Sequence, residues 1–137
     1  MGLPPMDSIQ GRSLAPHLLQ DASWVPATHI FAEMERHSGD PKPARSVRTD
    51  RYKYIRNLTD EPWGSGGGDG EWKEALALEP DQFFDEPRPP EELFDLEADP
   101  IEKVNLVDDP SMAEVLDELR GVLDAHLVAT NDFRAGE

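Results

Sequence analysis

The chain has 137 residues, no cysteine and a formal net charge of −16. Its length fits a single domain, and the lack of cysteine excludes a disulfide framework and a thiolate metal site. It has no run of about 18 apolar residues that would predict a membrane span, and its acidity argues against nucleic acid and anionic lipid as partners.

The charge is distributed unevenly. Residues 1–58 carry a net +2 and residues 59–137 carry −18, which favours a solvated, self-repelling surface over the second part. The first ten residues have neither a basic stretch nor an apolar core, so we expect no signal peptide. The sequence therefore indicates no particular compartment.

The first elements lie in residues 1–58. Residues 1–27 contain four prolines and no sustained periodicity, which predicts an extended lead-in. Residues 28–35 alternate like a strand, followed by a polar loop over 36–43. Residues 45–49 and 51–58 are rich in β-branched and aromatic side chains and predict two strands joined by a short turn. One face of the first strand would carry His29, Phe31, Glu33, Glu35 and His37.

The middle of the chain is less regular. Residues 64–70 are almost all glycine and predict a flexible loop, which is no phosphate-binding loop because no Gly-Lys-Ser/Thr follows. Residues 71–78 are compatible with two helical turns, and residues 80–90 are a proline-rich loop.

A dense pattern then spans residues 92–106. Leu93, Phe94 and Leu96 predict a brief strand. Asp99 predicts a helix N-cap, Pro100 suits the first helical position, and Glu102 suits a capping box. Asn105 would end this single helical turn in a left-handed conformation. The structural residues of the pattern are thus predicted to be Leu93, Asp95, Asp99, Pro100, Glu102 and Asn105.

Residues 111–128 give the strongest helix prediction. Apolar side chains recur at helical spacing from Met112 to Leu127. One apolar stripe needs a sheet to cover it. We therefore predict an α+β fold, in which a small antiparallel sheet of about four strands carries a C-terminal amphipathic helix on one face.

Several segments resemble the C-terminal region of sulfatases. Residues 92–106 resemble the signature E-L-Y-D-L-x-x-D-P-x-E-x-x-N-L, residues 9–18 resemble a linker, and residues 45–58 resemble a hairpin of that family. Residues 31–33 with His37 and Arg45, and residues 129–133, are most similar to the N-sulfoglucosamine sulfohydrolase (sulfamidase) branch. The resemblance implies that 1–27 is a linker from a missing catalytic domain and that 28–137 is the C-terminal subdomain.

Sulfatases hydrolyse sulfate esters or sulfamates with a formylglycine, made from Cys or Ser in C/S-x-P-S/T-R, and a calcium ion. This chain has no cysteine, and Ser13-Leu14-Ala15-Pro16 has the wrong spacing. The resemblance therefore implies no catalytic residue, no metal ligand and no cofactor in this chain. It implies a catalytic domain as partner, in cis or as a split chain.

Two residues are candidates for substrate binding by the same resemblance. His37 and Arg45 match a histidine and an arginine near the active-site mouth of the sulfamidase-like branch, so a sulfated sugar could be a ligand at the pocket edge. An arginine can bind sulfate or carboxylate with two hydrogen bonds. The alternatives are an ion pair that positions the hairpin for Arg45 and a solvated loop residue for His37.

Two other functions remain open. One is a stand-alone, acidic, non-enzymatic interaction module derived from a sulfatase. The other is an independent metal enzyme that uses His29, Glu33, Glu35 and His37. Because alternate residues of a strand are about 7 Å apart, one ion could reach only adjacent pairs. A polar, exposed face explains those residues better.

Overall fold

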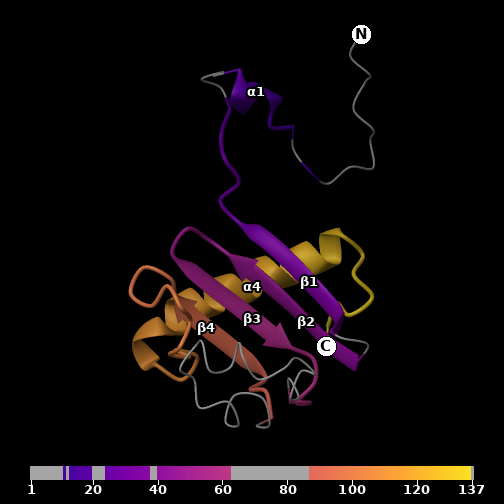
Figure 1. The fold of residues 1–137 in the computed structure, drawn as a ribbon, viewed down its shortest axis with the longest axis vertical. Coiled ribbons are helices and arrows are strands. Elements are labelled where there is room, and N and C mark those ends of the chain that lie inside the picture. The colour runs from indigo at the N-terminus through magenta and orange to yellow at the C-terminus, as the bar shows by residue number, and fades with distance from the viewer. Residues whose placement is uncertain (1–10, 12, 20–23, 38–39, 63–86, 137) are drawn as a thin grey trace, which may run out of the picture.

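A computed structural model describes residues 11, 13–19, 24–37, 40–62 and 87–136. Four antiparallel strands form one sheet in the order β1-β2-β3-β4, and a long helix, α4, crosses one face of it (Figure 1). The predicted α+β fold is confirmed. The elements are α1 (Ala15–Leu18), β1 (Ile30–His37), β2 (Asp40–Arg48), β3 (Tyr52–Asn57), β4 (Glu91–Asp95), a 3-10 turn (Pro110–Met112) and α4 (Ala113–Ala129).

The core lies between α4 and the sheet. The strand registers align Phe31, Val47, Tyr54 and Leu93 in one row across the four strands. The apolar stripe of α4 packs on this row, and its four buried leucines are Leu116, Leu119, Leu123 and Leu127. The predicted helix and its buried face are thus confirmed. Asp109 begins the helical region by accepting a hydrogen bond from the backbone N–H of Ser111 at 2.8 Å.

The strand β2 begins earlier than the sequence predicts. Residues 40–43 were expected in a loop, yet they pair with β1 as far as Asp40. Between the pairs Met34–Ala44 and Arg36–Pro41, one β1 residue lies opposite two β2 residues, as in a β-bulge. Pro41 and Pro43 are tolerated because the ladder with β3 extends only to Ala44, so this end of β2 has a strand neighbour on one side.

The turn after β4 differs from the predicted helical turn. Residues 99–106 contain no helix, and Glu102 rather than Asn105 has the left-handed backbone, with φ of 56°. The Asp99 carboxylate accepts hydrogen bonds from the N–H groups of Lys103 (2.6 Å) and Val104 (2.8 Å), so it closes a tight loop instead of capping a helix. The Glu102 side chain pairs with Lys53 at 2.5 Å and forms no capping box.

The other residues of the 92–106 pattern hold β4 in place. Leu93 is fully buried, and its N–H donates to the Asn105 side chain at 2.9 Å. The Asn105 amide also donates to the Glu91 carbonyl at 3.1 Å. Asp95 accepts hydrogen bonds from Arg51, the closest at 2.7 Å, and from the N–H of Glu97 at 3.1 Å. These contacts give the pattern a local structural role.

The lead-in leaves the body of the molecule at β1. It contains the single turn α1, which the prediction of an extended segment did not include, and it projects away from the sheet (Figure 1). The predicted loop at 64–70 and helical turns at 71–78 lie outside the described residues. Within the described part of the chain, no helix is long and apolar enough to cross a membrane.

Candidate functional site

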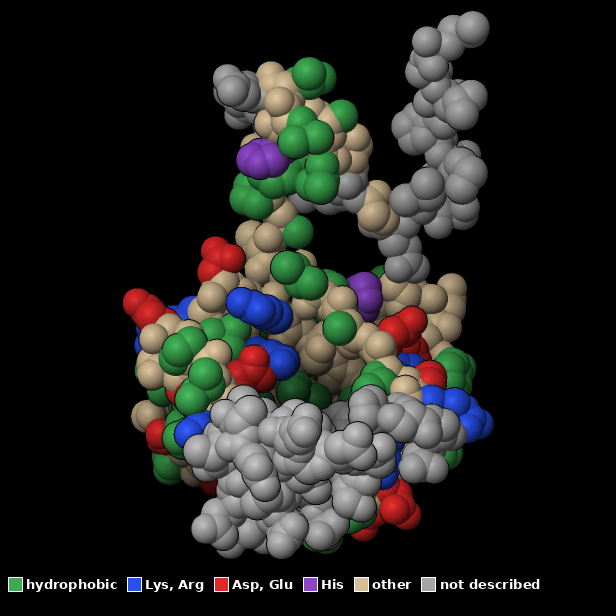
Figure 2. Space-filling model, viewed as in Figure 1, with side chains coloured by type: hydrophobic (Ala, Val, Ile, Leu, Met, Phe, Trp, Pro, Cys, Tyr) green, Lys and Arg blue, Asp and Glu red, His purple; other side chains and the backbone are tan. Residues whose placement is uncertain are grey.

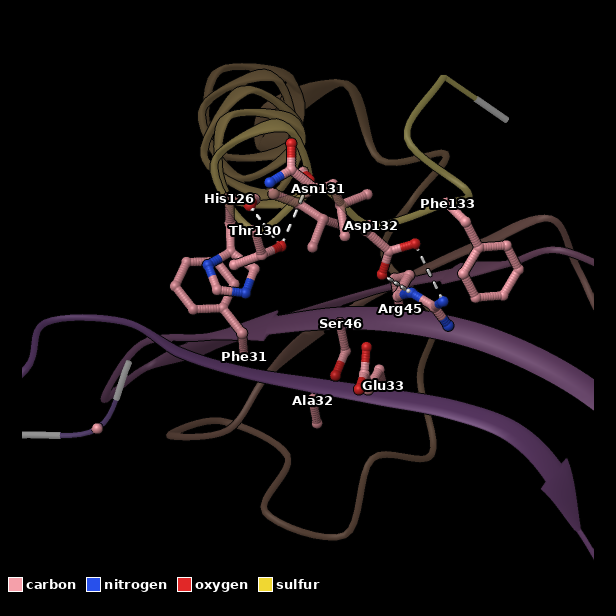
Figure 3. Close-up of a pocket in the computed structure, with 13 residues that line it drawn as sticks. Phe31, Ala32, Glu33, Arg45, Ser46, His126, Thr130, Asn131, Asp132 and Phe133 are labelled. Atoms are coloured by element: carbon pink, nitrogen blue, oxygen red, sulfur yellow. Dashed lines mark hydrogen bonds and ion pairs between the residues drawn. The ribbon is translucent and has the colours of Figure 1, made fainter. Parts of the chain in front are cut away.

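The site with the most chemical variety is a pocket of about 680 Å³ where the end of α4 meets β1 and β2 (Figure 3). Its wall combines aromatic rings, a hydroxyl, an amide and charged groups. The labelled lining residues are Phe31, Ala32, Glu33, Arg45, Ser46, His126, Thr130, Asn131, Asp132 and Phe133.

One wall of the pocket is an aromatic stack. Phe31 lies on the helix-facing side of β1, although the strand face that it shares with Glu33 and Glu35 was expected to be polar and exposed. Its ring stacks on His126 with centroids 3.7 Å apart and an interplanar angle of 3°. His126 lies in the last turn of α4. The stack therefore joins the edge strand to the end of the helix (Figure 3).

The opposite wall is made by the turn that ends α4. Asn131 has φ of 53°, and its N–H donates to the Val128 carbonyl at 3.2 Å. The N–H of Asp132 donates to the Leu127 carbonyl at 2.9 Å. This pair of bonds around a left-handed residue is a Schellman motif. It turns the chain back towards the sheet and aims the Asp132 carboxylate at β2.

Arg45 lies at the centre of an ion cluster, which we call the Arg45 cluster and which comprises Glu35, Arg45, Asp132 and Arg134. The Arg45 side chain is only 2% exposed. Its guanidinium donates to both carboxylate oxygens of Asp132, at 2.7 and 3.2 Å, and to Glu35 Oε1 at 2.6 Å. Arg134 binds the other oxygen of Glu35 at 3.1 Å.

The remaining donors of Arg45 bind the backbone. Its Nη1 donates to the carbonyls of Met34 (3.2 Å) and Ala44 (2.9 Å). A guanidinium has five N–H groups, so these contacts and those in the cluster occupy every one of them. The arrangement gives Arg45 the positioning role that was the alternative to substrate binding, and it leaves substrate binding by Arg45 an untested prediction.

The charges of the cluster stabilise one another. Hydrogen bonds from Arg134 and Arg45 hold the pKa of Glu35 below its ordinary value. The hydrogen bonds from Arg45 likewise lower the pKa of Asp132, against an opposing effect of burial. Both carboxylates are therefore ionised at neutral pH, and the cluster as a whole carries no net charge.

Phe133 stands at the edge of the pocket beside this cluster. It is 76% exposed, and the guanidinium carbons of Arg134 and Arg45 lie 5.1 and 5.9 Å from its ring centroid. Phe133, Ser46 and Asn131 line the same pocket, so a ring, a hydroxyl and an amide are available to one small polar ligand. The pocket thus offers uncharged contacts, together with the carboxylate of Glu33.

The structure separates the two predicted binding residues. Arg45 pairs across the sheet with Glu33, whereas His37 lies at the far end of β1 and pairs with Asp40. Four residues along a strand correspond to about 13 Å. The contribution of His37 to substrate binding stays a prediction.

The structure gives little support to the independent metal enzyme, whose site would use His29, Glu33, Glu35 and His37 on one face of β1. Glu35 is engaged by two arginines, and the ring of His29 contacts the Thr28 hydroxyl at 3.0 Å. Among the described residues, no three His, Asp or Glu side chains form a group that could hold a metal ion.

The sequence analysis did not find Asp132, Phe133 or Arg134 as site residues. A local signal was present, because Asn131 follows an amphipathic helix and asparagine commonly ends helices in the left-handed conformation. That signal predicts a chain reversal after residue 130. It does not identify Arg45, 87 residues earlier, as the partner of Asp132.

Comparison with known proteins places this fold. No protein-family model matches the chain. Over 96% of its length the chain is 32% identical to an ulvan-active sulfatase from Formosa agariphila, of which it spans 24%. Over 89% of its length it is 30% identical to a Delta 4,5-hexuronate-2-O-sulfatase from Bacteroides thetaiotaomicron, of which it spans 20%.

Solved structures agree with these sequence matches. A 2-O GAG sulfatase superposes with a TM-score of 0.67 at 25% identity, over 98% of this chain and 24% of that one. A protein solved with its substrate D-glucosamine-2-N,6-O-disulfate shares the fold, with a TM-score of 0.66 at 20% identity. The chain is similar to the C-terminal portion of sulfatases. It spans about a quarter or less of the relatives that it matches.

Proposed function

We propose that this chain acts as the C-terminal subdomain of a sulfatase-like hydrolase of sulfuric esters or sulfamates. It would pack against a catalytic portion, in cis or as a split partner, and would not be catalytic alone. The supporting observation is the match itself, which takes in 96% of this chain but 24% of the ulvan-active relative. The subdomain would therefore act through the shape that it gives to a larger enzyme.

In this proposal the catalytic groups belong to the partner portion. Formylglycine and calcium would be held there, since the resemblance assigns both to the catalytic domain. The chain would contribute the pocket beside the Arg45 cluster, with Phe133 and Asn131 at its edge. A sulfated sugar is the proposed ligand at that edge, and His37 and Arg45 are its contacts as the resemblance implies. Contact with Arg45 would require it to exchange one of its present hydrogen bonds, because all of its donors are occupied.

The narrower assignment to the sulfamidase-like branch is also a proposal. It rests on residues 31–33, His37, Arg45 and 129–133, whereas the names of the two curated relatives include ulvan and a 2-O-sulfated hexuronate. Turnover of N-sulfated and of O-sulfated sugars by an enzyme that carries this subdomain would separate the two possibilities.

The proposal is tested with the purified chain and a catalytic portion. The chain alone should hydrolyse no sulfated sugar. It should raise the activity of the N-terminal three-quarters of the Formosa agariphila sulfatase, produced separately, on ulvan. An unrelated acidic protein of similar net charge is the control.

Turnover by the chain alone would overturn the non-catalytic role. A chain that folds cooperatively, stays monodisperse and never affects the catalytic portion would favour the stand-alone acidic interaction module instead.

A further inference from the structure

The segment from α1 to the start of β1 differs from the rest of this acidic chain. Between Arg12 and Glu33, Asp21 is the only charged residue in the sequence, although 31% of the chain is charged. Figure 2 shows apolar side chains and a histidine among the described residues of the projecting part around α1. Protein interfaces are depleted in charge at their centres. The composition of this segment is therefore that of a contact surface.

Its apolar side chains are exposed rather than buried. Nine large hydrophobic residues are exposed among the described residues, and five of them fall within residues 14–30. These five, which we call the lead-in surface, are Leu14 (60% exposed), Leu18 (78%), Leu19 (80%), Val25 (61%) and Ile30 (65%). Clustered exposure of this kind marks interaction sites more often than scattered exposure does.

The local structure of the segment also calls for a partner. The helix α1 has four residues and buries none of them, whereas isolated helices of this length are unstable in water. The rings of Trp24 and His17 contact each other with centroids 4.4 Å apart and a tilt of 36°, which folds the segment back on itself. Among the described residues, the indole N–H of Trp24 is buried without a hydrogen-bond acceptor, and such groups are rare in folded proteins.

We infer that the lead-in surface is the docking site for the catalytic portion that precedes this region in sulfatases, an inference that rests on the proposed function. About three-quarters of the ulvan-active relative lies outside the match. Because the match is to the C-terminal portion of the relatives, in those proteins the remaining sequence is joined to the matched region at the end where this segment lies. A second copy of the chain is a poorer occupant, since each copy carries a net charge of −16.

The test is a binding titration with matched variants. Fluorescently labelled chain is titrated with the N-terminal three-quarters of the Formosa agariphila sulfatase, and the anisotropy gives Kd. Leu18→Asp should weaken binding at least tenfold. Val128→Asp, which adds the same charge at a side chain 69% exposed on α4, should change Kd less than twofold. Circular dichroism of both variants should match that of the parent chain, because neither replaced side chain is buried.

Three other outcomes contradict the inference. Absence of binding, or equal weakening by both variants, would overturn it. So would self-association of the chain that Leu18→Asp abolishes, because a second copy would then occupy the surface. A different kind of result would separate the two proposals. If the parent chain binds and Leu18→Asp weakens that binding, but binding brings no gain in sulfatase activity, the docking surface stands and the proposed role at the pocket edge is wrong.

Discussion

The body of the molecule, which is the sheet with α4, buries its apolar side chains and pairs its buried charges. The lead-in before it leaves apolar side chains exposed. In the body, even a guanidinium that is 2% exposed has a partner for every donor, and Leu119 and Leu123 lie fully inside the core. In the lead-in, Leu18 and Leu19 remain about four-fifths exposed. The difference indicates that the body can hold its own fold, while the lead-in depends on contacts from elsewhere.

The difference between the two regions is tested most strongly by replacing one leucine in each region with alanine. Leu119→Ala creates a cavity under α4 and should lower the free energy of unfolding by about 3 kcal/mol. Leu18→Ala should change it by less than about 0.5 kcal/mol, because that side chain is solvent-exposed. Urea denaturation of the isolated chain measures both. Similar losses in the two variants would show that the lead-in packs on the body.

The Arg45 cluster gives the next largest effect. Asp132→Ala leaves the buried guanidinium of Arg45 with Glu35 as its one carboxylate partner and should cost about 2 kcal/mol. Asp124→Ala is the matched control, because Asp124 pairs with Arg56 on the surface and its side chain is 58% exposed. Its cost should be at most about 1 kcal/mol. Equal costs would mean that the cluster is no more important than a surface ion pair.

Acid should weaken the same cluster. The pKa values of Glu35 and Asp132 are lowered in the folded chain, so their stabilisation is full above the ordinary carboxyl pKa and is lost as pH falls through the folded-state values. The difference in Tm between the parent chain and Asp132→Asn should be constant from about pH 7 to 5 and shrink below about pH 4. A difference that persists unchanged at about pH 2 would contradict this sign.

The smallest effect concerns the turn after β4. Glu102→Gly relieves a left-handed backbone but loses the pair with Lys53, so its net effect should be within about 0.5 kcal/mol. Asn105→Gly removes the side chain that binds Leu93 and Glu91 and should cost about 1.5 kcal/mol. Thermal melts of the two variants compare their losses of stability. A larger loss for Glu102→Gly than for Asn105→Gly would favour the predicted left-handed stop at Asn105.

Local patterns predicted most of the fold. The stripe from Met112 to Leu127 correctly predicted the helix face that meets the core. The face of β1 that carries Phe31 was expected to be polar and exposed, and that expectation was wrong because Phe31 packs against the core. The beginning of β2 was missed because Pro41 and Pro43 argue against a strand, and only the one-sided pairing in the sheet makes them acceptable. The prediction of a helical turn at 99–106 was wrong, because the Asp99 carboxylate accepts backbone hydrogen bonds that close a loop where the pattern favoured a helix.

The candidate site was less predictable than the fold. Arg45 was selected by resemblance, but its partners Glu35 and Asp132 meet only after the sheet and helix have formed. Charged residues carry no periodic signal that tells which opposite charge they will contact across the chain. The pocket therefore follows from the fold and could not be derived from residue patterns alone.

The order β1-β2-β3-β4 has a consequence for how quickly the chain can fold. Each strand pairs with its neighbour in sequence, and short connections join β1, β2 and β3, so these three strands can form hairpin by hairpin with small losses of chain entropy, whereas residues 58–90 separate β3 from β4. The bond between Arg45 and Asp132 instead spans 87 residues, and within the Arg45 cluster the bond between Arg134 and Glu35 spans even more, 99 residues. Both bonds should form after the sheet and α4 are in place, so their formation would report the last step to the native state.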